Sequence, residues 1–401
     1  MRVLLVSWEY PPVIEGGLGR HVRKLSEQLV ADGVEIHVLT RGGGRLPAEA
    51  DQHGVIVHRV RVGRGAQFPK DPSAFVRWVD AMNADMHALA AELCDRFDFD
   101  LVHSHDWLVA GAAERAARAI QRRWLVTVHA TEYGRHQGWV QNHPQSHIHA
   151  AERAMVRRAD HVIACSQYMR VHVANVFGVR PAKITGIPNG IDPRDLEPVD
   201  VDLPALRARY AAPDELLVLL VGRLVYEKGF HLALDALAPV VRRLGGVRFL
   251  VAGTGAAEAE LKRRARRLGL LEHGAFLGWV GDDILHSLYR VSDLCIVPSI
   301  YEPFGLVALE AMASGCLCVV ADTGGLREVV PVEGTVGLRF PSRDATALRD
   351  VLERVLTGDA ERAQLVAEAR EHVLRFGWGE VARRTADVYR MLVERAAAPA
   401  G

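Results

Sequence analysis

The sequence has few cysteines, no excess of either charge and no long apolar run. Its five cysteines are an odd number spread along 401 residues, mostly within apolar segments. This predicts buried thiols and a cytoplasmic location rather than a disulfide framework. Basic and acidic residues both number 49, which disfavours nucleic acid or an anionic membrane surface as the main partner. No stretch reaches the roughly 18 apolar residues of a membrane span, so no integral membrane segment is expected.

Short apolar runs instead alternate with amphipathic helical patterns along the whole chain. This alternation is typical of α/β folds with parallel sheets, and the length fits two to three domains. The runs form two series, so we expect two doubly wound domains, 1–200 and 201–379, joined by a turn-rich linker at about 190–213. The runs lie at residues 3–6, 35–39, 101–102, 125–128, 161–164, then 216–221, 248–252, 294–297 and 318–321.

Ligands of such folds bind at the carboxyl ends of the strands, so the loops there carry the candidate site residues. After the first run, Gly16 and Gly17 precede a helical pattern. Glycines at a helix start let backbone N–H groups approach a phosphate or a sugar. A tight turn that needs glycine only for packing is the alternative.

In the second domain, Arg223 follows the run 216–221 and Lys228 precedes the next helix. The two cations can converge on one anion, for which a diphosphate is the natural guest. The alternative is solvated surface charge, with Glu227 pairing one of them.

The segment 298–315 contains two glutamates that bracket a helix start. Glu302 follows a buried run, and Glu310 lies in an otherwise apolar helix that Gly315 ends. A buried carboxylate needs hydrogen-bond donors, and sugar hydroxyls are suitable, although a purely structural acid is possible. The backbone N–H groups around Phe304, Gly305 and Leu306 are expected to meet phosphate or sugar oxygens.

Histidines follow two strands of the first domain. His105 with Asp106, and then His129, could contact hydroxyls or a leaving group, or could be ordinary strand-end residues. His143, His147 and His149 are close in sequence but lack a cysteine or carboxylate at ligand spacing, so no metal site is predicted. Cys316 and Cys318 are expected in the core.

Together these motifs resemble the family 4 retaining glycosyltransferases of GT-B fold, in particular bacterial glycogen synthases and actinobacterial α-1,4-glucosyltransferases. The resemblance implies two Rossmann-like domains facing an interdomain cleft, with a last helix at about 380–401 returning to the first domain. The motifs that carry it are residues 9–12 with 16–19, 103–107, 222–224 with 227–229, the glutamates 302 and 310, and 324–325.

The resemblance also implies roles for the matching positions. Arg223 and Lys228 would hold the donor diphosphate and stabilise the leaving nucleotide. Glu310 would bind the ribose and Glu302 the transferred sugar. The other implied roles are phosphate contacts by Gly16, Gly17, Phe304, Gly305 and Leu306, a place beside the anomeric centre for His129, and an acceptor-side place for Asp106.

The implied reaction is transfer of glucose, with retention, from ADP-glucose or UDP-glucose to an α-1,4-glucan, with no cofactor and no metal. Bacterial glycogen synthases resembling this chain have a lysine before the first glycine pair, whereas Ile14 and Glu15 stand here, so the base preference stays open. The alternatives are another retaining hexosyl transfer (mannosyl, or one forming maltose 1-phosphate), a sugar-nucleotide epimerase and a non-catalytic glycan-binding protein.

Overall fold

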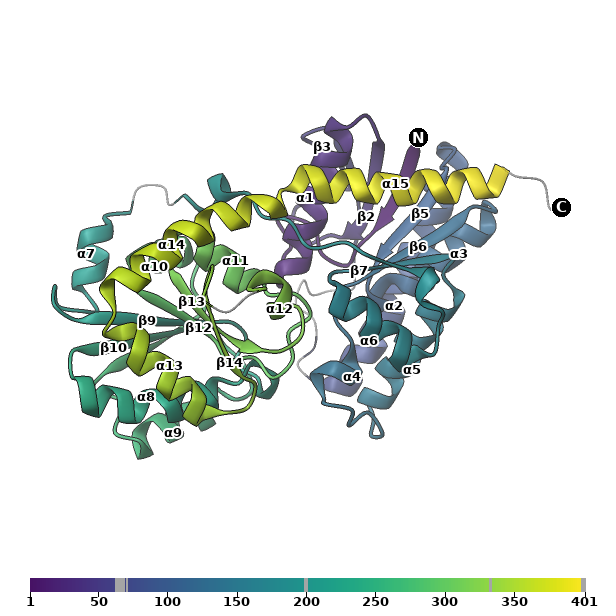
Figure 1. Ribbon diagram of the computed structural model, residues 1–401. Coiled ribbons are helices and arrows are strands. Elements are labelled where there is room, and N and C mark those ends of the chain that lie inside the picture. The colour runs from purple at the N-terminus through teal and green to yellow at the C-terminus, as the bar shows by residue number, and fades with distance from the viewer. Residues whose placement is uncertain (62–68, 70, 198–200, 332–333, 398–401) are drawn as a thin grey trace. The chain divides into compact units, whose positions relative to one another are not determined.

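The computed structural model describes residues 1–61, 69, 71–197, 201–331 and 334–397, and it divides the chain into two compact units (Figure 1). Unit 1 combines Met1–Gly190 with Trp378–Gly401, and unit 2 is Ile191–Gly377. The chain therefore passes from unit 1 to unit 2 after residue 190 and returns to unit 1 after residue 377. The sequence predicts these domain limits at residues 200 and 379.

Unit 1 is built on one eight-stranded sheet with the order β3-β4-β2-β1-β5-β6-β7-β8. All neighbouring strands are parallel except β3 and β4. The central strand β1 is buried and pairs on both sides, with Leu4 opposite His37 of β2 and Val102 of β5. The strands are β1 Arg2–Val6, β2 Glu35–Arg41, β3 Glu49–Gln52, β4 Val55–Val60, β5 Leu101–His105, β6 Arg123–Val128, β7 His161–Ala164 and β8 Ile184–Gly186.

The last helix of the chain, α15, belongs to unit 1 and lies alongside α1 (Figure 1). Its apolar face enters the same core as β1 and β2, and Tyr389 is fully buried there. The Tyr389 hydroxyl is 2.8 Å from Nδ1 of His103 in β5. The helices of unit 1 are α1 Gly17–Ala31, α2 Pro72–Arg96, α3 Ala110–Ala119, α4 Glu132–Arg135, α5 Gln145–Arg158, α6 Gln167–Phe177 and α15 Trp378–Ala397.

Unit 2 is built on a six-stranded, fully parallel sheet with the order β11-β10-β9-β12-β13-β14. Its strands are β9 Leu216–Val221, β10 Val247–Ala252, β11 Gly274–Gly278, β12 Leu294–Val297, β13 Leu317–Asp322 and β14 Leu338–Pro341. Its helices are α7 Leu203–Ala208, α8 Phe230–Leu244, α9 Glu258–Arg267, α10 Asp282–Val291, α11 Leu306–Ala313, α12 Leu326–Val329, α13 Ala345–Leu356 and α14 Asp359–Val373.

The turn-rich stretch at 190–213 is more ordered than a linker. Its described residues form a 3₁₀ turn, Pro193–Leu196, and the helix α7, which pack on α11 and α10 of unit 2. The Asp202 carboxylate caps α7 by accepting the Ala205 N–H at 3.0 Å. Proline and aspartate, which predicted a loop, here begin helices because both are favoured in a first turn. Residues 198–200 lie outside the described residues.

Both sheets confirm the predicted doubly wound α/β class, and each has a point where its strand order reverses. That point falls between β1 and β5 in unit 1 and between β9 and β12 in unit 2. The loops that carry Gly16, Asp106, Lys228 and Glu302 follow these four strands, where parallel sheets bind ligands.

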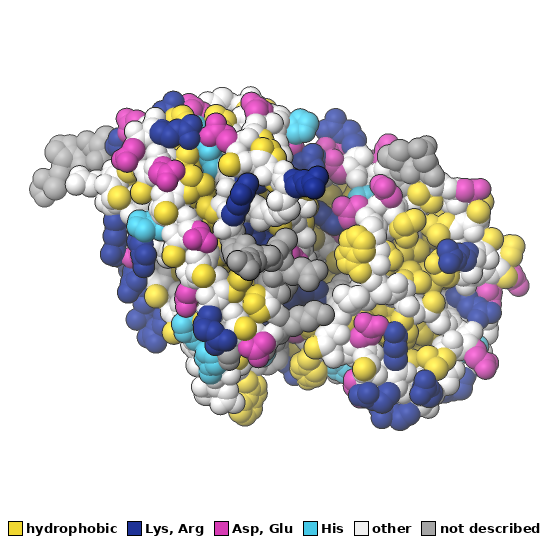
Figure 2. Space-filling view, turned by 180° about the vertical axis from the view of Figure 1, so that it is seen from behind, with side chains coloured by type: hydrophobic (Ala, Val, Ile, Leu, Met, Phe, Trp, Pro, Cys, Tyr) yellow, Lys and Arg dark blue, Asp and Glu magenta, His cyan; other side chains and the backbone are white. Residues whose placement is uncertain are grey.

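Acidic and basic side chains are interspersed over the face seen in Figure 2, in keeping with the zero net charge. Four of the five cysteines are buried, and all are free thiols. Within the described ranges, the helices are too short or too polar to cross a membrane.

Candidate functional site

Two predicted residues of unit 2 meet at the edge of its sheet. Lys228, in the loop after β9, places Nζ 2.7 Å from Oε2 of Glu302, in the loop after β12. The same Oε2 accepts the Ser299 hydroxyl at 2.9 Å. The Lys228 and Glu302 side chains are only 20% and 11% exposed. The two loops thus form one charged centre that is largely shielded from water.

Backbone contacts fix these loops against each other. The carbonyl of Glu227 accepts the N–H groups of Ile300 and Tyr301, at 2.8 and 3.3 Å. Gly229, beside Lys228, has φ +67°, and a Cβ there would lie 1.9 Å from the Pro298 carbonyl oxygen. The position of Lys228 therefore depends on a glycine that no other residue can replace without moving the backbone.

Arg223 lies in the same loop but is 58% exposed. Its Nη2 is 3.5 Å from Oε1 of Glu227, which is the pairing considered as the alternative to a diphosphate contact. At that distance, with the guanidinium largely in solvent, the pair contributes little energy. Arg223 thus lies at the edge where Lys228 also lies.

Glu310 has a protein partner in this structure. The fully buried Tyr289, in α10, donates its hydroxyl to Glu310 Oε2 at 3.0 Å. Burial, and next the nearby Glu310 carboxylate, raise the pKa of Tyr289 well above its usual value. The carboxylate is partly buried on α11, so the predicted ribose contact stays a prediction.

The start of α11 is shaped by two close backbone approaches. Gly305 has φ +123° and precedes Leu306, the first residue of the helix, while Phe304 is buried. A Cβ on Gly325 would lie 2.4 Å from Phe304 Cα, and the Gly325 N–H donates to the Glu302 carbonyl at 2.9 Å. The loop after β13 thus supports the segment 302–306, whose contacts with phosphate stay a prediction.

In unit 1, the buried Glu9, which belongs to the motif 9–12 but has no predicted role, organises the glycine loop. Glu9 Oε2 accepts the N–H groups of Glu15 and Gly16, at 2.7 and 3.0 Å. Burial raises the pKa of Glu9, although these hydrogen bonds oppose the shift. The Gly16 N–H, expected to face a phosphate, thus has an internal acceptor, and Gly17 begins α1.

Asp106 connects the ends of β5 and β6. Its Oδ1 accepts the His129 N–H at 2.8 Å. The residue is buried, and burial raises the pKa of Asp106 to about 6. Its φ of +59° is rare for a residue with a side chain. Such a strained conformation costs about 1–3 kcal/mol and is found mostly at functional sites.

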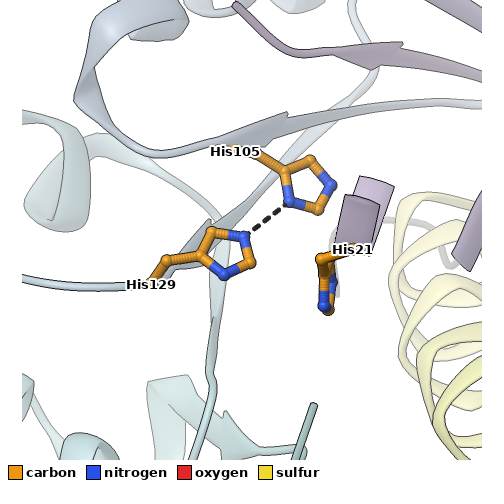
Figure 3. Close-up of side chains that lie close together, drawn as sticks. All are labelled: His21, His105 and His129. Carbon is orange, nitrogen blue, oxygen red and sulfur yellow. Dashed lines mark hydrogen bonds between the residues drawn. The ribbon is translucent and has the colours of Figure 1, made fainter. Parts of the chain in front are cut away.

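His129 lies in a group of histidines rather than alone (Figure 3). His105 Nδ1 is 3.0 Å from His129 Nε2, and His21, from α1, packs against His129 with ring centroids 4.7 Å apart. Burial lowers the pKa of His129 to about 4. Burial, and next the neighbouring imidazoles, lower the pKa values of His105 and His21 well below their usual range. These rings are therefore neutral at neutral pH.

A buried glutamate close to this edge gives a prediction about stability. Glu152, in α5, accepts the Glu132 N–H with both oxygens, at 2.8 and 3.0 Å. Burial raises the pKa of Glu152 to about 8, so the folded state retains a proton that the unfolded state loses above about pH 4.5. The free energy of unfolding should then fall as pH rises from about 5 to about 8, by at most about 1.4 kcal/mol per pH unit.

We expect Glu152→Gln to remove this pH dependence of the free energy of unfolding, because the amide oxygen still accepts the Glu132 N–H but the amide cannot ionise. Urea unfolding at about pH 5 and about pH 8 measures it, with the exposed Glu92→Gln as the matched control. Equal pH dependence in wild type and Glu152→Gln would contradict the prediction.

The remaining candidates resolve simply. The Cys316 and Cys318 side chains are buried in the core, as predicted. The ring centroids of His143 and His147 are 6.3 Å apart. Among the described residues, the group with the spacing of a metal site is His21, His105 and His129, which the sequence did not predict because His21 looks like an ordinary helix position.

The comparisons with known proteins cover both units. The model of Glycosyltransferase Family 4 matches residues 15–195, and that of Glycosyl transferases group 1 matches residues 204–372. The chain is 39% identical to a glycogen synthase of Mycobacterium tuberculosis, over 97% of this chain and 94% of that protein. It is 32% identical to a D-inositol 3-phosphate glycosyltransferase of Frankia alni, over 95% and 96%.

Solved structures agree on the fold. Sucrose-phosphate synthase from Thermosynechococcus elongatus superposes with a TM-score of 0.83 and 25% identity, covering 98% of this chain and all of that one. The catalytic domain of starch synthase IV from Arabidopsis thaliana gives a TM-score of 0.75 at 20% identity, over 98% and 99%. These are GT-B proteins, which confirms the predicted fold class. The chain belongs to the family 4 glycosyltransferases and is most simply described as glycogen synthase-like.

Proposed function

We propose that this glycosyltransferase transfers glucose, with retention and without a metal, from ADP-glucose or UDP-glucose to an α-1,4-glucan or a related acceptor. The observation that carries the proposal is the Lys228–Glu302 centre at the reversal point of the unit 2 sheet. The 39% identity to a glycogen synthase along nearly the whole chain supports glucose and a glucan.

Unit 2 would bind the donor. An ammonium group has three hydrogens, and Glu302 takes one of those of Lys228, so the others can reach phosphate oxygens. Arg223, from the same loop, would add a second cation. Both positive charges would stabilise the diphosphate as it leaves, the electrostatic task that a divalent ion performs in other enzymes.

Unit 1 would contribute His129 and Asp106. In the proposed step, the donor C1–O bond breaks, the acceptor oxygen bonds to C1 on the same face, and its proton passes to the departing phosphate oxygen. The carbon becomes cation-like on the way. A neutral His129 ring does not repel that charge and can still hydrogen-bond a sugar hydroxyl.

The test is a donor and acceptor screen. The purified chain is incubated with ADP-glucose or UDP-glucose and a maltooligosaccharide, with and without EDTA. Nucleotide release is followed together with the anomeric configuration of the lengthened product. We expect α-linked products in both arms. Donor conversion without acceptor would indicate an epimerase, and glucan binding without turnover a binding protein. Glucose 1-phosphate, inositol phosphate and GDP-mannose arms test the related transfers.

An exposed tryptophan leads to a prediction about the acceptor. Trp139 is 78% exposed, on a turn after α4. Its backbone N–H donates to the His136 carbonyl at 2.9 Å, and the backbone N–H of Gly138 donates to the Tyr133 carbonyl at 2.8 Å. These bonds fix the backbone of the turn, and a flat, exposed apolar ring on it can bind the face of a sugar.

We expect Trp139→Ala to raise the KM for maltooligosaccharide about tenfold, since losing about 60 Å² of buried apolar contact costs about 1.5 kcal/mol. Turnover at saturation and the KM for the donor should stay unchanged. Leu374→Ala, at a position 67% exposed in unit 2, is the control. An unchanged acceptor KM in Trp139→Ala would exclude an acceptor contact at the Trp139 ring.

A further inference from the structure

Three imidazoles from three separate elements of unit 1 converge on one point (Figure 3). His21 comes from the second turn of α1, His105 ends β5, and His129 follows β6. One ring nitrogen of each lies within 4.8 Å of those of the other two.

The protein leaves part of this group unsatisfied. One contact, His105 Nδ1 to His129 Nε2 at 3.0 Å, joins two of the rings. His21 Nδ1 is buried and has no hydrogen-bond partner among the described residues. A buried polar atom without a partner costs about 1–3 kcal/mol, so such atoms in a native protein call for a ligand, a water or an ion.

We propose that His21, His105 and His129 form a Zn²⁺ site with a fourth position open to water or to an incoming oxygen. Three neutral imidazoles are an established ligand set for zinc. Zinc–nitrogen bonds of about 2.0–2.1 Å place the nitrogens of a tetrahedral site about 3.3 Å apart. The hydrogen-bonded pair, His105 Nδ1 and His129 Nε2, is already at 3.0 Å, and His21 offers a third nitrogen within 4.8 Å of both histidines. A bound ion would replace that hydrogen bond.

The surroundings of His21 fit a metal ligand. The Asn189 side chain interacts with His21, and its Oδ1 is buried with no partner in the described structure. Metal-bound histidines usually donate their second N–H to an oxygen of this kind. A rotation of the amide would present Oδ1 to His21. On the other side, Trp378 packs edge-on against the ring, with centroids 5.3 Å apart.

Zinc at this site would compete with the reaction proposed above. His129 would then be held by the ion instead of contacting the transferred sugar, so zinc should inhibit turnover. This consequence rests on the proposed function, whereas the binding site does not.

Equilibrium dialysis of the untagged full chain against ZnCl₂ tests the site without any substrate. We expect one zinc per chain, with affinity more than about 100-fold weaker in His21→Ala and in His105→Gln, and about tenfold weaker in Asn189→Ala. The double variant His143→Ala, His147→Ala is the control and should bind like wild type. Sub-stoichiometric binding, or binding insensitive to His21→Ala, would overturn the proposal.

Cobalt substitution provides a second measurement, which does not depend on how well the variants fold. Co²⁺ bound by three imidazoles in a four-coordinate site absorbs strongly in the visible range, whereas a six-coordinate oxygen site absorbs weakly. A weak spectrum in wild type would also overturn the proposal. Zinc inhibition of wild-type turnover, relieved in His21→Ala, then tests the predicted competition with the reaction. If the chain shows no turnover, the proposed function fails, and the zinc-binding measurements alone decide the metal site.

Discussion

Lys228→Ala is expected to lower turnover by roughly 10²–10³-fold, the size of effect seen when one group that stabilises developing charge is removed. Lys228 is the cation that Glu302 and the two hydrogen-bonded loops hold in place. Without it, negative charge on the departing diphosphate would face Glu302 with Arg223 as the remaining cation of the proposed site. Steady-state kinetics with the best donor from the screen measures the loss, and circular dichroism checks the fold.

The matched control is Lys262→Ala. Lys262 is also a lysine of unit 2 paired with a glutamate, Glu258, at 2.7 Å, but it lies exposed on α9. Turnover should be unaffected by this variant. Wild-type turnover in Lys228→Ala would remove the assigned role, and loss of the circular dichroism signal would show that the pair is needed for folding instead.

Gly229→Ala is expected to cost more than about 4 kcal/mol of stability, which is exceptional for one methyl group. The new Cβ would lie 1.9 Å from the Pro298 carbonyl oxygen. That oxygen belongs to the backbone just before the Ser299–Glu302 segment, so relief requires moving the loop that carries the site. Urea unfolding of the purified variant, or its soluble yield, measures the effect.

Gly269→Ala separates this clash from backbone strain. Gly269 follows α9 in a left-handed cap, with φ +72° close to the value at Gly229 and the Leu270 N–H donating to the Ala265 carbonyl, but a Cβ there meets nothing within 4 Å. Its substitution should cost only the left-handed conformation, about 1–2 kcal/mol. Equal destabilisation by the two variants would mean that the contact with Pro298 is not the cause.

The sequence predicted the interior strands better than the outer ones. Central strands such as β9, Leu216–Val221, are buried on both faces and appear as continuous apolar runs. The edge strand β3 has the sequence EADQ, and β11 contains two glycines. Their pairing is set by neighbours distant in sequence, so no local apolar pattern marks them.

For the candidate site, too, the sequence predicted what local pattern shows and missed contacts between distant residues. Lys228 and Glu302 could be found because each follows a recognisable strand, but their mutual contact spans 74 residues and depends on strand order. The contacts of His21 and Glu9 were not predicted, because local sequence does not show which buried groups meet.

The return of α15 to unit 1 also fixes the order in which a growing chain can fold. Unit 2 is continuous in sequence, so its sheet can form as soon as it leaves the ribosome, whereas the core around β1 lacks Tyr389 and its helix until synthesis reaches them. Synthesis adds about 5–20 residues per second. Until it reaches α15, the apolar surface beside α1 that this helix covers stays exposed. During that interval, the nascent chain is most open to chaperones and to aggregation.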